Sequence, residues 1–461
     1  METNNKAQIL YQIKVEGILE LQSPLRIGAG DLEGSAPVDV QVLKNDDEQP
    51  FIPGTSLAGV LRSDMKKLVH TGSGSVDELF GHISREGTDD VQSAVAIDDI
   101  LLENAEIAIR DGVSIDPYTG IAKSKAKYDY EVVERGAKGP FTMLITIRRY
   151  FVDAVPQWQS LIDELVGHLC HGFRVGSMTA KGFGKAVIKK STIQTYDFSD
   201  FKDVCHWLKR EAPEHVKKGK GKKIIPANTL TIRADFFLKT SLLIRSSEIT
   251  DKDIQSRIHA VPLKSKGTYL IPGTSVKGVL RHQAGRILRT MGKPENLLDD
   301  LMGFTNDSDT KGKKSRFLTD EIYLQDDTVK AVKQTRNAID KITGNTMDSR
   351  LFTEKVLYPQ KGKETSLTMT YAITDCHDAW EIGLALFLLK DLWTGQVALG
   401  GDKAVGRGYL QGIRADISYR NDQNVESTWH IIQPGKVDNG DAAALEQYAQ
   451  ALVQLTAKGD A

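Results

Sequence analysis

The sequence predicts an α+β protein that contains two tandem copies of one antiparallel-sheet domain. The main observation is an internal repeat: residues 52–63 read IPGTSLAGVLRS and residues 271–282 read IPGTSVKGVLRH, which match at nine of twelve positions with a separation of 271 − 52 = 219. Two later pairs of motifs recur with a separation of 224 (339 − 115 and 406 − 182). Because 461 residues exceed one ordinary domain, a duplication accounts for the length.

Each copy is expected to open with a half-buried strand, because apolar and polar residues alternate over residues 9–22 and again over 229–240. The segment between the copies is rich in lysine (217–223) and is expected to be flexible and solvated. The last segment contains an amphipathic stretch that predicts a terminal helix. The predicted division is a first domain at 1–190, a basic linker at 191–226, a second domain at 227–432 and a C-terminal helical tail at 433–461.

The repeated segment predicts the start of a helix. Pro53 and Gly54 make a turn, Thr55 or Ser56 can cap a helix, and apolar residues follow at helical spacing. The free N–H groups at a helix start favour an anion such as phosphate. A turn that merely begins a core helix is the alternative for a single copy. Two copies favour the anion site, and its candidate phosphate-binding residues are Ser56, Arg62, Ser275 and Arg281.

A second repeated motif predicts a hairpin in each half. Residues 115–120 read IDPYTG and residues 339–344 read IDKITG, and each is followed by a strand that carries aromatic residues. Basic residues lie beside them, with Lys125 and Lys127 in the first half and Arg350 in the second. Cations and aromatic rings that alternate in this way suit a single nucleic-acid strand. A plain surface hairpin with solvated lysines is the alternative.

A glycine-rich loop closes each half, at 175–185 and 399–409. Glycines allow positive φ and close approach of the backbone to a ligand. Four basic residues in these loops are candidate RNA contacts: Lys181, Lys185, Lys403 and Arg407. Neither loop has the Gly-Lys-Ser/Thr ending of a P-loop.

The composition excludes the simplest nucleic-acid signal. The formal net charge is −1, so any RNA must be bound by local basic patches. The three cysteines are widely spaced, which argues against a disulfide framework. No apolar run is long enough to span a membrane, and the N-terminus lacks the features of a signal peptide. We expect a cytoplasmic protein without membrane contact.

The ordered set of motifs resembles the RAMP superfamily of CRISPR proteins, over nearly the whole chain except the predicted linker and tail. The resemblance is closest to the backbone subunits of type III (Csm/Cmr-like) effector complexes, in a fused double form as in type III-D systems. It implies tandem ferredoxin-like (RRM-like) domains with a hairpin thumb in each. It also implies binding of CRISPR RNA, cleavage of complementary target RNA, and assembly with other type III subunits, including a large polymerase-like subunit.

The resemblance assigns the cutting role to an aspartate upstream of the IPGTS turn. Residues 37–42 read PVDVQV and match the family pattern, so Asp39 is the candidate catalytic residue and Mg²⁺ or another divalent cation the expected cofactor. In the second half His259 aligns with Asp39, which argues against cleavage there. Asp251 and Asp253 lie in the same loop and are possible substitutes.

Two other functions remain open at this point. One is a scaffold subunit that binds guide RNA and cuts nothing. The other is a stand-alone enzyme that processes guide RNA. The processing role is less favoured, because such enzymes rely on a histidine near the N-terminal groove and the first histidine is His70, within the region of the repeated helix.

Overall fold

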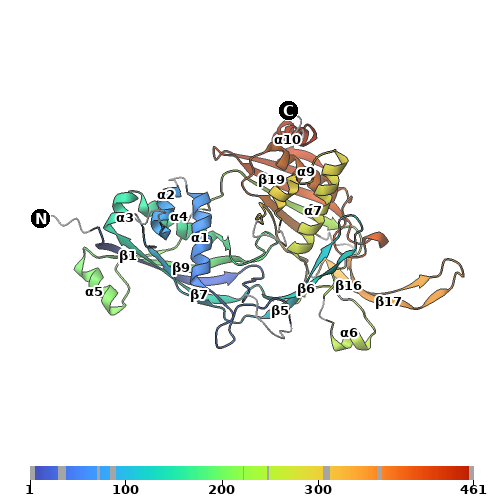
Figure 1. The fold of residues 1–461 in the computed structure, drawn as a ribbon, viewed down its shortest axis with the longest axis horizontal. Helices are drawn as coiled ribbons and strands as arrows, with labels where there is room; N and C mark the ends of the chain where they lie inside the picture. The colour runs from blue at the N-terminus through green and yellow to red at the C-terminus, as the bar shows by residue number, and fades with distance from the viewer. Residues whose placement is uncertain are drawn as a thin grey trace. The chain divides into compact units, whose positions relative to one another are not determined.

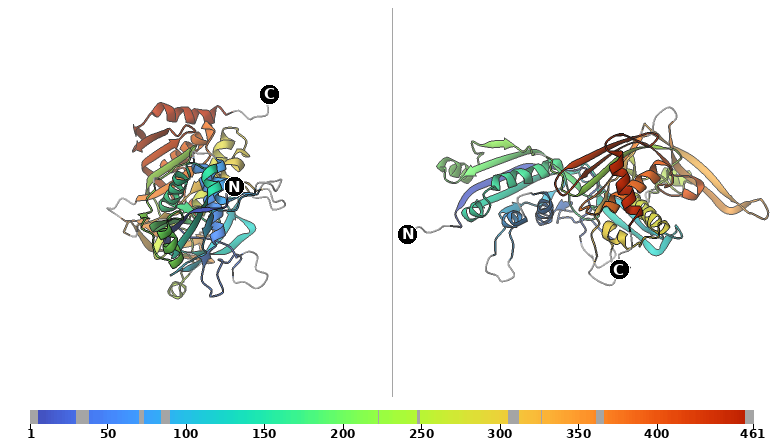
Figure 2. Two further views of the ribbon diagram at one scale, coloured as in Figure 1. Left: turned by 90° about the vertical axis from the view of Figure 1, so that its left-hand side faces the viewer. Right: turned by 90° about the horizontal axis from the view of Figure 1, so that it is seen from above.

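A computed structural model describes residues 6–29, 38–69, 73–83, 90–221, 223–246, 249–304, 312–325, 327–360 and 366–455. The chain forms two compact units. Unit 1 contains residues 1–108, 131–179 and 183–226, and unit 2 contains residues 109–130, 180–182 and 227–461. Figures 1 and 2 show the fold from three directions.

Unit 1 is an antiparallel sheet covered by helices. Its elements are β1 (Ile9–Leu21), β2 (Phe51–Ile52), α1 (Gly54–Leu68), α2 (Ser73–Phe80), β3 (Val95–Ile97), β4 (Ile100–Leu101), β7 (Lys138–Arg148), α3 (Arg149–Ala154), α4 (Trp158–His171), β8 (Phe173–Arg174), β9 (Lys185–Asp197), α5 (Phe201–Lys209) and β10 (Val216–Lys218). The strand order is β10-β9-β1-β7-β3, and β8 pairs with β9.

The core of unit 1 lies between this sheet and helices α1 and α4. In α1 the buried residues Leu57, Leu61, Met65 and Leu68 are spaced at about one helical turn, so one face of the helix turns inward. They belong to the same apolar cluster as Val15 on the central strand β1. The apolar spacing in the sequence therefore explains which face of the helix packs on the sheet.

Unit 2 repeats this architecture and adds to it. Its own elements are β11 (Thr229–Leu238), α6 (Asp251–Gln255), β12 (Lys264–Ser265), β13 (Thr268–Ile271), α7 (Gly273–Thr290), α8 (Leu297–Met302), β14 (Phe317–Thr319), β15 (Ile322–Tyr323), β16 (Val329–Ile339), β17 (Thr346–Pro359), β18 (Ser366–Ile373), α9 (Ala379–Trp393), the 3-10 turn η1 (Lys403–Val405), β19 (Leu410–Arg420), β20 (Glu426–Ile432), β21 (Lys436–Asn439) and α10 (Ala442–Val453). Most of the first-half hairpin, formed by β5 (Ile107–Ile115) and β6 (Ala122–Val133), also belongs to unit 2.

The two sheets share a four-stranded antiparallel core. Unit 2 has the order β14-β18-β11-β19-β20-β21, so β19-β11-β18-β14 corresponds to β9-β1-β7-β3 of unit 1. The helices correspond as well, since α1 and α2 occupy the same place in chain order as α7 and α8. The predicted α+β fold with two repeated antiparallel domains is confirmed. Each repeat also has a two-stranded hairpin, β5–β6 and β16–β17, hereafter the first and second hairpins.

The segment expected to be a linker is largely folded. Strand β9 continues to Asp197 and pairs with the central strand β1, α5 follows it, and β10 pairs with β9 at the sheet edge. Apolar and aromatic residues of this segment, among them Tyr196 and Trp207, pack together and order it. The lysine-rich stretch alone predicted a flexible linker. The tail also departs from a purely helical segment, because β21 pairs with β20 before α10 begins.

Candidate nucleic-acid interface

Asp39 lies on an extended segment that is pinned on both sides. Val38 and Val42 are buried and anchor the segment, whereas Asp39 is exposed. The carbonyl oxygen of Val40 accepts a hydrogen bond from the amide of Glu131 at the base of the first hairpin, at 2.9 Å. The Glu131 carboxylate accepts in turn from the amide of Val42, at 3.0 Å. The predicted catalytic carboxylate is therefore held at the base of a hairpin on a fixed backbone.

His259 occupies the corresponding position in unit 2. The carbonyl oxygen of Ala260 accepts from the amide of Lys355 at the base of the second hairpin, at 2.9 Å, as Val40 does for Glu131. The residue before it is His259, just as Asp39 precedes Val40. Its ring nitrogen Nδ1 lies 3.2 Å from the amide of Thr353, which can donate to it. Nδ1 is thus engaged with the hairpin backbone.

The two aspartates considered as substitutes in unit 2 have different surroundings. Asp253 is buried, forms a capping box with Thr250 at the start of α6, and pairs with Lys355. The hydrogen bond from Lys355 lowers the pKa of the Asp253 carboxyl. Asp253 therefore stabilises the loop and is not a candidate for cleavage. Asp251 is exposed in the first turn of the same helix.

The helix starts of the two repeats are not capped as expected. The capping positions are Pro53 and Pro272, and neither helix has a side-chain cap, so the expectation that Thr55 or Ser56 caps the helix is wrong. In unit 1 the amide of Gly54 instead donates to the carboxylate of Asp99, at 2.8 Å. This carboxylate takes one of the N–H groups that a phosphate would need. Ser56 is exposed on the first turn, and Ser275 is half-buried.

The repeated arginines of these helices have structural partners. Arg62 pairs with Asp77 of α2 at 2.6 Å, and Arg281 pairs with Asp299 of α8 at 2.9 Å. Arg281 also donates to the carbonyl oxygen of Gly303, at 2.7 Å. Each arginine therefore holds the short helix that follows. This structural role is enough to explain why both repeats have an arginine here, and no RNA contact is needed.

The repeated ID-x-x-TG motif forms the tip of each hairpin. Oδ1 of Asp116 accepts from the amides of Tyr118 and Thr119, at 3.0 and 2.8 Å. Oδ1 of Asp340 accepts from the amides at 342 and 343 in the same way, both at 2.8 Å. In each case hydrogen bonds from the turn lower the pKa of the carboxyl. The motif aspartates are thus turn formers.

The basic residues predicted on the hairpins are exposed. Lys125 has a φ of 55°, and Ser349 at the matching position has a φ of 58°, so both hairpins contain the same irregularity. The Lys127 side chain is 66% exposed and lies 3.6 Å from the Asp111 carboxylate. Arg350 lies on the exposed part of the second hairpin. All three cations can therefore reach a ligand along the hairpins.

The first hairpin is fastened to the rest of unit 2 by side chains whose pairing the sequence does not reveal. Nη1 of Arg110 lies 2.5 Å from the Glu321 carboxylate, and both side chains are buried. The Tyr323 hydroxyl donates to the other oxygen of Glu321, at 2.6 Å. At the tip, the Arg289 guanidinium of α7 lies 5.0 Å from the ring centre of Tyr118. The only sequence signal was that position 118 is aromatic in IDPYTG and not in IDKITG.

In each glycine-rich loop, a glycine packs closely against the backbone of the same loop. Gly184 and Gly408 have φ of 73° and 81°, and a Cβ at either would lie within 2 Å of a carbonyl oxygen in the same loop, Val175 or Leu399. These glycines thus allow close approach of two backbone segments of the protein, whereas the sequence predicted close approach of the backbone to a ligand. Lys181 forms a bridge with Thr319 in unit 2, and Lys185 begins β9. Lys403 is exposed on η1.

Arg407 does not face solvent, which corrects its assignment as an RNA contact. Its side chain is 3% exposed and lies 2.9 Å from the Glu354 carboxylate and 2.6 Å from the Asp402 carboxylate. Arg336 pairs with the same two carboxylates, at 2.6 and 2.9 Å. This network joins the glycine-rich loop to the second hairpin. Its place in a polar loop predicts a surface residue, but the Glu354 carboxylate that helps to bury it is 53 residues away in the chain.

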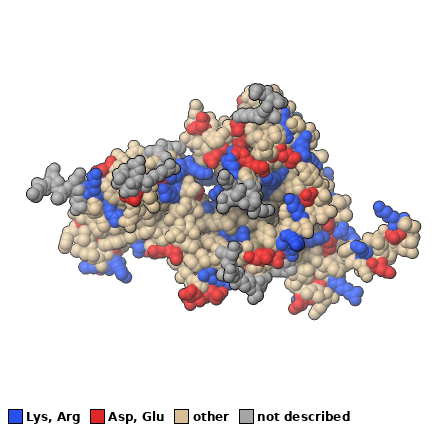
Figure 3. Space-filling model, viewed as in Figure 1, with Lys and Arg blue, Asp and Glu red and all other residues tan. Residues whose placement is uncertain are grey.

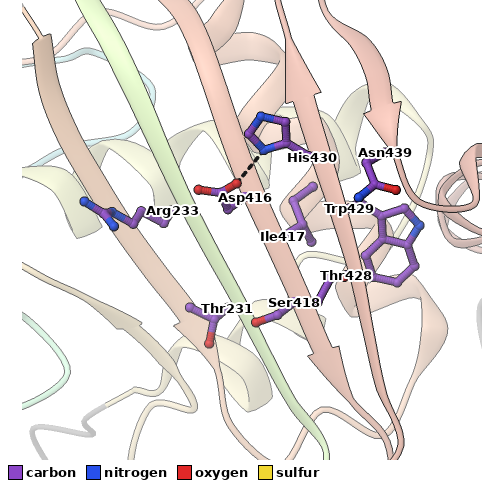
Figure 4. Close-up of a pocket in the computed structure, with 9 residues that line it drawn as sticks. All are labelled: Thr231, Arg233, Asp416, Ile417, Ser418, Thr428, Trp429, His430 and Asn439. Carbon is purple, nitrogen blue, oxygen red and sulfur yellow. Dashed lines mark hydrogen bonds and ion pairs between the residues drawn. The ribbon is translucent and has the colours of Figure 1, made fainter.

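No protein-built metal centre is present in the described parts of the chain, where no group of three His, Cys, Asp or Glu side chains could hold an ion. A hollow of about 410 Å³ does lie on the exposed face of the unit 2 sheet (Figure 4). Thr231, Ser418 and Thr428 form one row across its strands, and His430 pairs with Asp416 at 2.6 Å. None of the predicted site residues lines it.

Two residues that the sequence predictions use, Pro37 and His70, fall outside the described residues. Lys222 of the lysine-rich stretch is also outside them. The histidine that bears on the processing role therefore has no structural account.

Comparison with known protein families assigns the chain to a class. The RAMP superfamily model matches residues 18–187 and 235–411, one stretch in each repeat. The matched stretches cover well over half of the chain, so this protein belongs to the RAMP superfamily. RAMP proteins are components of CRISPR systems. No curated protein matches the sequence. Within the described residues, no helix is both long and apolar enough to cross a membrane.

Proposed function

We propose that this protein is a backbone subunit of a type III CRISPR effector complex, which binds CRISPR RNA and cuts complementary target RNA with Asp39. Membership in the RAMP superfamily supports the CRISPR role. The duplicated hairpin-bearing domain supports a subunit that lies along a guide RNA. The exposed cations Lys125, Lys127, Arg350 and Lys403 are the proposed guide contacts.

The observation that carries the cleavage proposal is the difference between two equivalent positions. Asp39 and His259 both precede the residue whose carbonyl oxygen binds the base of a hairpin. Unit 1 presents an exposed carboxylate there, whereas unit 2 presents an imidazole whose Nδ1 lies against the hairpin backbone. We infer one cleavage site in the first repeat and none in the second.

The chemistry needs only one carboxylate at the right place. Asp39 would accept the proton of a target 2′-hydroxyl as this oxygen attacks the adjacent phosphorus. The P–O5′ bond then breaks, and water supplies the proton to the leaving 5′-oxygen. The products are a 2′,3′-cyclic phosphate and a 5′-hydroxyl. The pinned backbone between Val38 and Val42 would keep the carboxylate in position.

A divalent cation would be held at this site by Asp39 together with phosphate groups of the RNA. Mg²⁺ is often bound by one or two carboxylates together with substrate phosphates, and Asp39 would be the protein ligand. When bound, the cation would neutralise phosphate charge in the transition state. Among the described residues Asp39 belongs to no group of three possible metal ligands, so phosphate oxygens of the RNA would complete the coordination.

Cleavage mapping tests the proposal. The reconstituted complex is incubated with end-labelled target RNA and Mg²⁺, and products are resolved on a denaturing gel. Asp39→Ala should remove one cut and leave guide RNA occupancy unchanged, because an exposed loop carboxylate contributes little to folding. His259→Ala is the matched control and should remove none. Retention of every product by Asp39→Ala would refute the catalytic role.

The remaining candidate function is a scaffold that holds guide RNA without cutting. The second repeat favours it, because His259 stands there where the first repeat has Asp39. In that case the wild-type complex would protect the target without cleaving it. EDTA tests whether the cation serves cleavage or guide RNA binding. If the cation is needed for cleavage alone, its removal should leave guide binding intact.

We further propose that the second hairpin contacts a neighbouring subunit of the complex. It exposes large apolar side chains: Ile342 in the tip turn is 95% exposed, and Leu351 on β17 is 57% exposed. Exposed apolar groups of this size mark interaction surfaces. The other type III subunits, including a large polymerase-like one, are the proposed partners. Ile342→Ser should weaken co-purification of the neighbour without changing the melting temperature of the isolated chain.

A further inference from the structure

Helix α5 of unit 1 lies outside the stretches that match the RAMP family. It spans Phe201–Lys209, between the matched residues 18–187 and 235–411. The helix follows β9 directly and precedes the edge strand β10. It is visible beside the sheet of unit 1 in Figure 1. Its role therefore does not follow from membership in the family.

The inner face of α5 fixes the helix to the sheet. The Trp207 ring packs against Tyr196 of β9, with ring centres 5.1 Å apart in an edge-on arrangement. The buried Asp203 carboxylate accepts from the amide of Asp197 at 2.9 Å, and Asp200 caps the helix by accepting from the amide of Lys202. The helix thus has a defined orientation, and the side that faces away from the sheet is fixed as well.

The outer face of α5 is apolar and uncovered within the described chain. Phe201 is 80% exposed and Leu208 is 75% exposed. Residues 201, 205 and 208 are spaced i, i+4 and i+7, so Phe201, Cys205 and Leu208 line one side of the helix. A phenylalanine and a leucine exposed to this extent, two turns apart on one helical face, are typical of interaction anchors.

The segment that contains α5 is basic. Over residues 200–220 the exposed charged side chains comprise six cations against three carboxylates. The cations are Lys202, Lys209, Arg210, Lys217, Lys218 and Lys220, and the carboxylates are Asp200, Glu211 and Glu214. Figure 3 shows blue Lys and Arg atoms bordering tan surface where α5 lies in Figure 1. The whole chain has a net charge of −1, so residues 200–220 are a locally positive segment, in which Lys202 and Lys209 directly flank Phe201 and Leu208.

We propose that the outer face of α5 docks an acidic amphipathic helix of another protein. Phe201 and Leu208 would contact its apolar side, and the surrounding lysines would pair with its carboxylates. A second copy of this chain would place two positive surfaces against each other in a two-fold contact, which is unfavourable. RNA is also disfavoured, because Phe201 is the single aromatic residue of the three on this face, and Cys205 and Leu208 offer no ring for base stacking. This proposal is independent of cleavage by Asp39.

The test uses a defined probe and the full-length protein. The probe is a fluorescein-labelled helical peptide of about 15 residues with leucines spaced i, i+4, i+7 and flanking glutamates. A second peptide replaces every glutamate by lysine. Fluorescence anisotropy should show affinity for the acidic peptide at least about tenfold higher than for the basic one.

Two variants distinguish α5 from general stickiness. Phe201→Ser/Leu208→Ser should lower the affinity for the acidic peptide about tenfold or more, whereas Ile342→Ser on the second hairpin should not change it. Both substituted residues of α5 are exposed, so the melting temperature should stay the same. Equal binding of the two peptides, no binding at all, or an unchanged affinity of the α5 variant would overturn the proposal.

Two further measurements test whether a second copy of this chain or an RNA binds the outer face of α5 instead. Light scattering would reveal a dimer that the α5 variant abolishes, and anisotropy with a labelled single-stranded RNA would reveal RNA binding that the same variant abolishes. Either result would overturn the proposal in favour of a second copy or of RNA. A monomer whose RNA affinity is the same with and without the α5 substitutions supports it.

Discussion

Replacement of Arg407 by alanine tests whether a buried ion network holds unit 2 together. Its guanidinium lies 2.9 Å from Glu354 and 2.6 Å from Asp402, and it donates to Gln334 at 3.0 Å. Removal of one partner from a buried ion pair costs about 3–5 kcal/mol. Arg336 still pairs with both carboxylates in the variant, so we expect a loss near the lower end, about 3 kcal/mol.

Arg245 provides the matched control. It pairs with the same carboxylates, Glu354 at 3.1 Å and Asp402 at 3.3 Å, but its side chain is 59% exposed. Exposed ion pairs contribute about 0–1 kcal/mol, so Arg245→Ala should be nearly neutral. The assay is urea unfolding of the full chain followed by tryptophan fluorescence, with hydrogen exchange on β17 to locate the change. If Arg407→Ala costs no more than Arg245→Ala, burial does not decide the strength of this network.

The pH dependence gives an independent check. Burial raises the pKa of the Glu354 carboxyl, but hydrogen bonds from Arg407 and Arg336 outweigh it and hold the pKa below that of a free glutamate. A carboxyl with a lowered folded pKa contributes stability that is present above its unfolded pKa and lost as the pH falls through the folded pKa. The stability gap between wild type and Arg407→Ala should therefore shrink on acidification below about pH 4. A gap that stays constant down to the acid transition would contradict this reasoning.

Three further outcomes can be measured. Burial lowers the pKa of Lys277 in the folded protein to about 7, so the unfolded protein binds more protons at this residue between pH 7 and 10. The free energy of unfolding should therefore rise over this pH range. Lys277→Met should abolish the rise in urea titrations. Arg110→Met leaves the buried Glu321 carboxylate without its guanidinium and should speed hydrogen exchange over the first hairpin, an effect that unchanged exchange at residues 109–130 would exclude. Gly408→Ala should cost about 2 kcal/mol or more in unfolding free energy, because its Cβ would meet a carbonyl oxygen at 1.9 Å, whereas Gly406→Ala, with nothing within 4 Å, should cost only about 1 kcal/mol for its left-handed backbone. Equal costs for the two glycine variants would show that the clash is relieved.

The sequence was sufficient for the fold because the information is local and occurs twice. Apolar residues at helical spacing define the buried face of α1, and alternation defines β1. The repeated IPGTS and ID-x-x-TG segments mark a helix start and a hairpin tip at matching positions in both units. Even the alignment of His259 with Asp39 agrees with the backbone hydrogen bonds that pin both segments.

The roles of the charged residues depended on the tertiary structure. Arg407 and Lys403 lie four residues apart in one loop, yet Arg407 is buried and Lys403 is exposed. One of its two carboxylate partners, the buried Glu354, is 53 residues away in the chain. Arg110 likewise finds Glu321 at a separation of 211 residues. Residue type and spacing reveal that a side chain is charged, but the cost of burying that charge is met by partners that only folding brings together.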